Sequence, residues 1–165
     1  MSYSIEIIYK PNSAKLFLDR HLVFTIQPEK PKKTLPWFLP DFDALNSSTE
    51  VIAKITRQSC FFNKQFANIL FVAGGKIIVL YKNRFSVRNI WGKLDDTDYL
   101  IRFNYQQDAT EFYVNGELIA NFFIRQPKGF DWDTYQINFN LEEKYGHHAF
   151  AIFCFMFPAI RELDY

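Results

Sequence analysis

The sequence predicts a mainly β protein in which short antiparallel strands pack around a hydrophobic C-terminal helix. Three observations support this prediction. Apolar and polar residues alternate along most of the chain, which is the period of a strand with one buried face. Aromatic residues, which favour strands, make up 19% of the 165 residues, and 19 of them are Phe. The alternation stops near residue 140, and a continuous apolar run at residues 149–160 follows.

Eleven segments are typical of short strands, because they alternate in polarity and are rich in Ile, Val, Phe and Tyr. They are residues 4–10, 15–19, 21–26, 49–57, 67–72, 76–81, 85–90, 99–104, 110–114, 117–125 and 134–140. Turn signals separate them at residues 10–13, 19–20, 74–75, 95–98 and 115–116. Asn115-Gly116 is the clearest signal, because both residues tolerate the positive φ of a type I′ hairpin. So many short strands indicate a sandwich or a barrel, and a closed barrel leaves no strand edge exposed.

The apolar run at residues 149–160 predicts a buried helix and not a membrane span. Its twelve residues would extend about 18 Å as a helix, whereas the hydrocarbon core of a bilayer is about 30 Å thick. The run is hydrophobic on every face, so it requires enclosure, which a closed sheet would supply. Asn140 followed by Glu143 matches a capping box, so we expect the helix to start there. We expect Pro158 to kink or end the helix near Phe157.

A weak internal repeat relates two parts of the chain. Residues 50–54, followed by Arg57 and the apolar residues 69–71, are similar to residues 117–121, followed by Arg125 and residues 137–139. The offset is 67 to 68 residues. Each copy contains a strand, a turn and a returning strand, so the pattern predicts a hairpin unit used twice. Chance similarity between two aromatic hairpins is the alternative.

Three features of the sequence argue against nucleic-acid binding, secretion and a disulfide. The chain has 19 Lys and Arg against 18 Asp and Glu, so it lacks the basic surface of a general nucleic-acid binder. The N-terminus alternates in polarity without a signal-peptide pattern, so we expect a cytoplasmic chain that starts at Met1, with no transmembrane segment. Cys60 and Cys154 lie in apolar surroundings, and we expect two buried thiols in preference to a disulfide.

Motifs for catalysis and metal binding are missing from the sequence, so we expect a protein that is not an enzyme and carries no cofactor and no metal. There is no GxSxG, no HExxH and no Cys/His pattern with zinc spacing. The segment 95–98, which contains three Asp, is more typical of a turn than of a cation site. His147 and His148 are adjacent, and we expect one of them to contact a backbone carbonyl at the helix end.

Four segments resemble a known family. They are residues 15–26 (KLFLDRHLVFTI), 50–71 (EVIAKITRQSCFFNKQFANILF), 116–139 (GELIANFFIRQPKGFDWDTYQINF) and 147–163 (HHAFAIFCFMFPAIREL). Their pattern and order are similar to the tubby C-terminal-like superfamily, which includes tubby domains, phospholipid scramblases and LURP-one-related proteins. The resemblance implies that residues 1–165 form a single domain, a closed antiparallel barrel of about twelve strands around a buried hydrophobic C-terminal helix.

The resemblance also implies a class of ligand, because tubby domains bind phosphoinositide head groups and scramblases are linked to lipid movement. The chain departs from scramblases in two respects. Asp131, Asp133 and Glu142 do not have the spacing of a calcium loop, and no cysteine-rich palmitoylation run is present. The implied activity is therefore lipid recognition without calcium.

One candidate binding segment combines basic and aromatic residues. Lys30, Lys32 and Lys33 precede Trp37 and Phe38 between prolines. Lysines attract anionic lipids, and Trp and Phe suit the interface between head groups and acyl chains, so the segment would suit a membrane surface. Two alternatives are a proline-rich crossing with its aromatic side chains packed on the barrel, and a docking site for a protein.

A second candidate group is cationic and comes from two segments: Lys54, Arg57, Lys82, Arg84, Arg88 and Lys93. The last four surround Trp91, and strand alternation would place Arg84 and Arg88 on one face. Phosphate recognition requires convergent Arg and Lys, so Arg84 and Arg88 would line a head-group pocket together with Lys54 and Arg57. An ordinary solvated sheet face is the alternative.

We therefore expect a non-catalytic binding module that recognises anionic phospholipid or phosphoinositide head groups. It would be cytoplasmic and would attach peripherally to a membrane surface, with an anionic lipid or a protein as its partner and no nucleic acid. A protein-interaction or structural module is the alternative. A lipocalin-type carrier, with an apolar ligand inside the barrel, is a further alternative.

Overall fold

The computed structural model describes residues 1–8, 13–29, 41–57, 65–83, 86–104, 109–125 and 134–163. Twelve strands are followed by a 3₁₀ helix and an α-helix. The strands are β1 (Ser2–Ile8), β2 (Ser13–Leu18), β3 (His21–Pro28), β4 (Phe42–Asn46), β5 (Val51–Arg57), β6 (Gln65–Phe71), β7 (Lys76–Asn83), β8 (Ser86–Leu94), β9 (Thr97–Asn104), β10 (Ala109–Val114), β11 (Glu117–Arg125) and β12 (Thr134–Asn140). The helices are η1 (Glu143–His148) and α1 (Ala149–Leu163).

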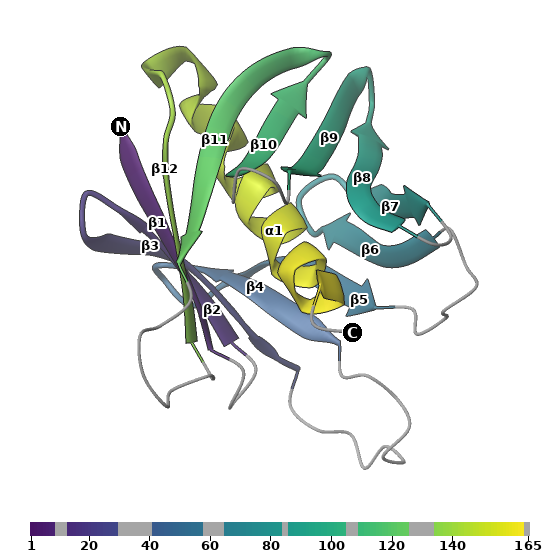
Figure 1. Ribbon diagram of the computed structural model, residues 1–165. Helices are drawn as coiled ribbons and strands as arrows, with labels where there is room; N and C mark the ends of the chain where they lie inside the picture. Colours follow the sequence, from purple (N-terminus) through teal and green to yellow (C-terminus); the bar gives the residue numbers. More distant parts are fainter. Residues whose placement is uncertain are drawn as a thin grey trace.

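The strands form one closed antiparallel barrel (Figure 1). Each strand pairs with its neighbours in the sequence, and β1 pairs with β12 to close the barrel. That last register runs from Ser2 opposite Asn140 to Ile8 opposite Thr134. The predicted fold class is therefore confirmed.

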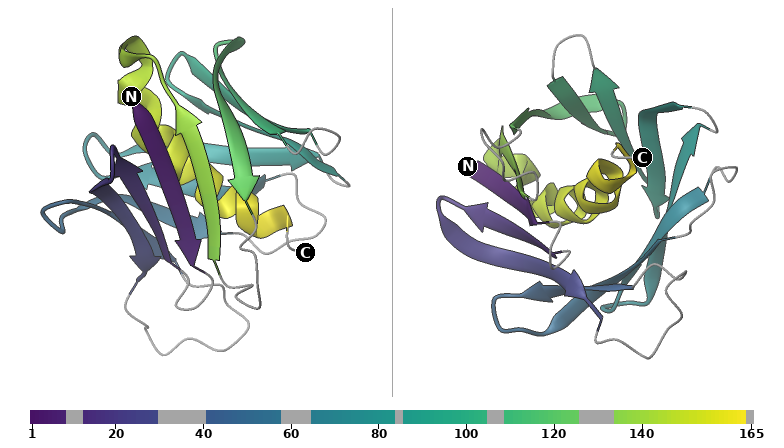
Figure 2. Two further views of the ribbon diagram at one scale, coloured as in Figure 1. Left: turned by 60° about the vertical axis from the view of Figure 1, so that its left-hand side comes forward. Right: turned by 60° about the horizontal axis from the view of Figure 1, so that its bottom comes forward.

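The helix α1 lies inside the barrel, and Figure 2 shows the strands as a ring around it. All residues from 151 to 159 are buried. The ring centroid of Phe155 lies 5.2 Å from that of Tyr99 and 5.9 Å from that of Phe112, while Phe157 packs edge-on against Phe42. The side chains of α1 thus fill the space between the walls. No described helix is both long and apolar enough to cross a membrane.

Alternation along the strands separates an inner face from an outer face, as the sequence predicts. In β1, Tyr3, Ile5 and Ile7 are buried. Gly92 of β8 marks a close approach of the inner wall to α1, because a Cβ atom there would lie 3.1 Å from Phe155 Cζ. A larger residue at this position would push the helix away from the wall.

The two-residue turns lie where the sequence predicts them. Asn115 and Gly116, with φ of 50° and 81°, join β10 to β11 in the backbone geometry of a type I′ turn. Asp19 and Arg20, with φ of 47° and 71°, join β2 to β3 in the same way. These turns fix the register of the strands on either side.

The predicted repeat corresponds to two hairpins, β5 with β6 and β11 with β12. They are six strands apart in the ring of twelve, so they lie on opposite sides of the barrel. Ala53 and Ala120 occupy matching positions in the two copies, and both are buried.

The structure corrects some strand predictions. The strand β4 is absent from the predicted set, because Asp43, Ala44 and Asn46 are poor strand formers, yet it pairs with β3 and β5. The predicted turn at 95–98 is confined to residues 95–96, since β9 starts at Thr97. The strand β8 extends past the predicted end at Ile90, because its last residues pair with β9.

The predicted capping box is wrong. Asn140 belongs to β12, and the 3₁₀ helix η1 starts at Glu143 after Glu142, whose side chain makes no capping hydrogen bond. The ammonium group of Met1 donates to the carbonyl of Leu141 at 2.9 Å, and the N–H of Leu141 donates to the carbonyl of Met1 at 3.1 Å. These two bonds extend the strand pairing past residue 140, so the helical segment starts later than predicted.

Of the two outcomes predicted at Pro158, a kink or an end of the helix near Phe157, the end is not observed. Pro158 lies inside α1, which continues to Leu163. Proline cannot donate a helical hydrogen bond, and this normally disfavours it inside a helix. Phe157 and Ala159 are both fully buried, so packing inside the barrel outweighs the missing bond.

Candidate functional site

The barrel has two ends with different connections (Figure 1). Neighbouring strands are antiparallel, so the last residues of every odd-numbered strand and the first residues of every even-numbered strand lie at the same end of the barrel. We name this the lower end. Six connections belong to it: residues 9–12, 29–41, 58–64, 84–85, 105–108 and 126–133. The opposite, upper end has residues 19–20, 47–50, 72–75, 95–96, 115–116 and 141–148. The helix α1 follows β12, so it runs from the upper end toward the lower end.

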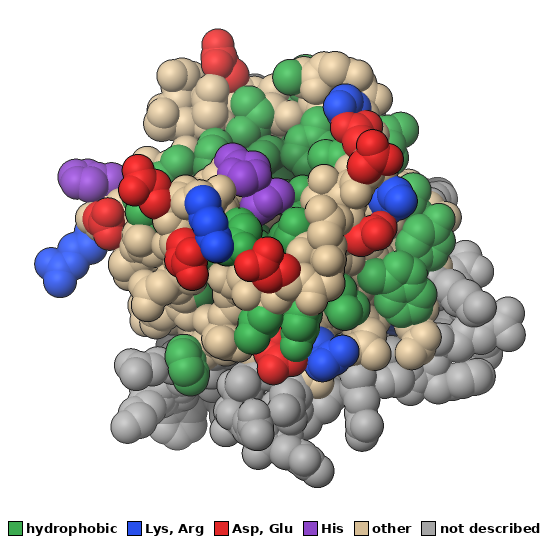
Figure 3. Space-filling model, turned by 90° about the horizontal axis from the view of Figure 1, so that it is seen from above, with side chains coloured by type: hydrophobic (Ala, Val, Ile, Leu, Met, Phe, Trp, Pro, Cys, Tyr) green, Lys and Arg blue, Asp and Glu red, His purple; other side chains and the backbone are tan. Residues whose placement is uncertain are grey.

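The connections at the two ends differ in charge. Those of the upper end contain six Asp or Glu and two Lys or Arg. Figure 3, seen from above, shows acidic side chains over this end. The connections of the lower end contain seven Lys or Arg and five Asp or Glu. An anionic partner would therefore be repelled more strongly by the upper end.

Most of the predicted site residues belong to the lower connections. Lys30, Lys32, Lys33, Trp37, Phe38 and Arg84 lie outside the described residues, as does Cys60, and Arg88 is described only as backbone of β8. The N–H of Glu29 donates to the carbonyl of Asp41 at 2.8 Å. The basic and aromatic segment 30–40 thus starts and ends at the lower end of the barrel.

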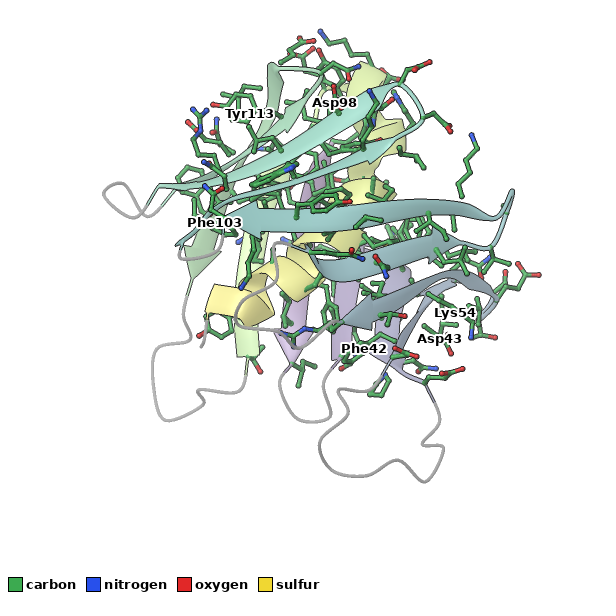
Figure 4. All side chains as sticks on the ribbon, turned by 90° about the vertical axis from the view of Figure 1, so that its right-hand side faces the viewer. Phe42, Asp43, Lys54, Asp98, Phe103 and Tyr113 are labelled. Carbon is green, nitrogen blue, oxygen red and sulfur yellow. The ribbon has the colours of Figure 1, made fainter. Side chains whose placement is uncertain are left out.

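Lys54 and Arg57 lie on opposite sides of the barrel wall, so they do not line one pocket as predicted. They are three positions apart along β5, and alternation turns Arg57 inward and Lys54 outward. Lys54 Nζ lies 3.1 Å from Glu29 Oε1 and 3.6 Å from Asp43 Oδ1. Figure 4 shows Asp43 and Lys54 close together. The hydrogen bond with Glu29 and the charge of Asp43 raise the pKa of Lys54.

Arg57 and Lys82 are cationic side chains on the inner face of the wall at the lower end. They are 9% and 7% exposed, and they come from the ends of β5 and β7, with β6 between these strands. Burial lowers the pKa of Lys82, and the positive charge of Arg57 lowers it further. The two charges are therefore close enough to interact. The sequence analysis groups Lys82 with Trp91. In the structure Trp91 pairs with Tyr81 and Lys82 pairs with Ile90, so the side chains of Lys82 and Trp91 lie on opposite faces of the wall.

The outer wall carries a groove of about 350 Å³, which we name the Trp91 groove. A row of side chains crosses four strands in direct register: Tyr81 of β7, Trp91 of β8, Leu100 of β9 and Tyr113 of β10. All four line the groove. Tyr81 and Trp91 are stacked, with ring centroids 6.4 Å apart and ring planes 22° apart. Sequence reasoning found Trp91 but missed the row, because the row exists only once the four strands are in register.

The helix end contains a histidine contact that differs from the prediction. His148 Nδ1 lies 3.4 Å from the hydroxyl of Tyr99, and the hydrogen bonds of the described residues include none from this side chain to a backbone carbonyl. Burial lowers the pKa of His148, and the neighbouring His147 lowers it further. Burial also raises the pKa of the Cys154 thiol, which disfavours the reactive thiolate. Within the described ranges, no group of three or more His, Cys, Asp or Glu is placed to hold a metal ion.

Comparison with known proteins bears on the fold alone. No protein-family model matches the chain, and no curated protein matches it. Among solved structures, the X-ray structure of a protein from Arabidopsis thaliana is similar, with a TM-score of 0.52 and 8% sequence identity. The match covers 92% of this chain and 88% of the plant protein. At this identity the similarity shows a shared barrel fold, and one fold hosts unrelated functions.

Proposed function

We propose that the chain is a member of the tubby C-terminal-like superfamily, that it acts by binding without catalysis, and that its lower end recognises an anionic phospholipid head group. The observation that carries this proposal is the pair of buried cations, Arg57 and Lys82, on the inner face of the lower end. The family assignment rests on the four similar segments, and the barrel with its enclosed helix agrees with it.

Two neighbouring cations in a buried position repel each other and lose hydration, so an anionic group placed beside them would interact favourably with both. The helix α1 also ends toward the lower end, where its last carbonyl groups carry partial negative charge. A phosphate group suits the same position. The guanidinium of Arg57 would form paired hydrogen bonds with phosphate oxygens, and the ammonium of Lys82 would act as a point charge.

The distribution of charge supports the same orientation at a membrane. Lys30, Lys32 and Lys33 belong to a lower connection, and each basic residue near an anionic membrane surface contributes about 1 kcal/mol to binding. The acidic upper end would then face away from the lipid. In this arrangement the protein is cytoplasmic and attaches to the membrane peripherally, with the lower end against the head groups.

Vesicle cosedimentation with the full chain tests the proposal. We expect binding to phosphatidylcholine vesicles that contain phosphatidylserine or a phosphoinositide, no binding to phosphatidylcholine alone, and loss of binding in high salt. Arg57→Gln and Lys82→Gln should each weaken binding, while thermal melting verifies that the variants fold. Lys144→Gln at the upper end is the matched control and should bind like the wild type.

The inner substitutions could weaken binding by unfolding the barrel, so a second variant changes residues outside the core. Lys32→Glu combined with Lys33→Glu changes only a connection, and it should also weaken binding. If this variant and both inner variants bind as the wild type does, the lipid proposal is wrong. If only the surface variant loses binding, the basic connection attaches to the membrane and the inner head-group site is wrong.

A further inference from the structure

We infer that the Trp91 groove on the outer wall is a binding site for a neutral oligosaccharide. The site is independent of the proposed head-group site, because Arg57 and Lys82 face the inside of the barrel whereas the groove lies outside it. Three properties of the groove carry the inference: an aromatic floor, polar rows on both sides of that floor, and balanced charge.

The floor of the groove is the row of Tyr81, Trp91, Leu100 and Tyr113. Neighbouring strands are about 4.8 Å apart, so a row that crosses four strands is about 14 Å long. Outward positions of a soluble barrel are normally polar, yet Tyr81 remains 37% exposed and stacks on Trp91. The face of an aromatic ring is electron-rich and attracts the C–H groups on the face of a sugar ring.

A polar row borders the floor on each side. Toward the upper end, Lys93 lies opposite Asp98 in the register, with Lys93 Nζ 3.7 Å from Asp98 Oδ1. Toward the lower end, the next outward row lies just beyond the residues that line the groove, and there Arg102 lies opposite Glu111, with Arg102 Nη1 4.0 Å from Glu111 Oε2. Each row thus offers hydrogen-bond donors and acceptors side by side. A sugar hydroxyl both donates and accepts, so it can use both members of each pair.

The balance of charge selects against ionic ligands. Each border row has one cation and one anion, so a phosphate or carboxylate attracted by one member is repelled by the other. A neutral polyhydroxy ligand has no such conflict. The side chains of Lys93 and Asp98 are 61% and 68% exposed, so a ligand in the groove can reach both.

The lower border is also held in place before a ligand binds. The hydroxyl of Tyr113 donates to Glu111 Oε2 at 2.9 Å, and the guanidinium of Arg102 lies 5.2 Å from the centroid of the Tyr113 ring. These contacts fix the orientation of one ring of the floor, which reduces the entropy lost on binding. Figure 4 shows Tyr113 and Asp98 on the same side of the barrel, well away from Lys54 and the lower end. The volume of the groove is that of a small-ligand site.

Calorimetric titration of the full chain with cellohexaose, maltohexaose and chitohexaose tests the inference. We expect at least one of these neutral sugars to bind, and Trp91→Ala to weaken that binding by about tenfold or more, because the central ring of the floor is lost. Lys93→Ala combined with Asp98→Ala should also weaken it, and both of these residues are exposed enough to be replaced without unfolding the barrel. Phe123→Ala is the matched control, since Phe123 is a 62% exposed aromatic residue outside the groove.

Three results would overturn the inference. They are the absence of heat with all three sugars at millimolar concentration, sugar binding that survives both groove variants, and binding of a proline-rich peptide at the groove in place of a sugar. The groove variants should still bind anionic vesicles if the head-group proposal is right. Failure of one proposal is therefore distinguishable from failure of the other.

Discussion

Replacing Gly92 with alanine tests how tightly the helix packs against the inner wall. A Cβ atom at this position would lie 2.8 Å from Ile78 Cγ2, 3.0 Å from Leu80 Cδ2 and 3.1 Å from Phe155 Cζ. All three neighbours are fully buried, so none can move into solvent to make room. Gly92 does not have a positive φ, so alanine fits its backbone conformation. The cost of the substitution is therefore steric.

Two effects of opposite sign set the size of the change in stability. Overpacking a dense core costs about 1–3 kcal/mol. Alanine also restricts the unfolded chain more than glycine does, which stabilises the folded state by about 0.4–1 kcal/mol. Since three core atoms lie within contact distance of the added methyl, the steric cost prevails, and we expect a net loss of about 1–2 kcal/mol. For a domain of this length the melting temperature should fall by about 2–8 °C.

Urea unfolding followed by circular dichroism measures the change, and a second substitution isolates its cause. Ile78→Ala removes the atom closest to the added methyl, and alone it should cost about 2–5 kcal/mol through the cavity that it leaves. In the double variant the methyl at position 92 enters that cavity. The stability lost by the double variant should therefore be smaller than the sum of the losses of the two single variants, by about 1 kcal/mol or more. A Gly92→Ala variant as stable as the wild type, or an additive double variant, would refute the packing described for the wall and the helix.

Two further predictions concern the helical segment. Phe153 is fully buried inside the barrel, so Phe153→Asp should leave no soluble folded protein, because an unpaired charge in a core is strongly destabilising. Phe153→Leu should fold, and the yield of soluble protein compares the two. Burial lowers the pKa of His148 below 6.5, so below that pH the unfolded chain binds more protons and the free energy of unfolding should decrease with acidification. In urea titrations, the free energy of unfolding of the His148→Asn variant should fall less between about pH 7 and pH 5 than that of the wild type. The same pH dependence in both proteins would show that His148 does not cause the decrease.

The architecture could be predicted because its main signals are local. A segment that is apolar on all faces but too short to cross a bilayer requires enclosure, and the buried helix α1 follows directly from this property. Asn115 and Gly116 likewise predict their turn from the two residues alone. The features that sequence patterns miss depend on neighbours. The strand β4 exists because β3 and β5 pair with it, and α1 continues through Pro158 because its surroundings are packed.

The candidate sites were harder to predict, because they depend on which face of the wall a residue occupies and on the register between strands. Lys54 and Arg57 are close in sequence, but an odd separation along a strand puts them on opposite faces. Arg57 and Lys82 are 25 residues apart, and they come near each other only because β5, β6 and β7 pair in one particular register. The same dependence on register hides the row at Trp91.

The filled interior restricts where this barrel can bind a ligand. Because α1 occupies the space between the walls, a ligand must bind at an end of the barrel or on its outer surface, and the two proposed sites are of these two kinds. Arg57 and Lys82 face inward at the lower end, where α1 finishes, whereas Trp91 faces outward from β8. The barrel wall separates these positions, so a substitution at one should leave binding at the other intact. A variant that loses both vesicle and sugar binding would therefore indicate a damaged barrel, and only a selective loss would identify a site.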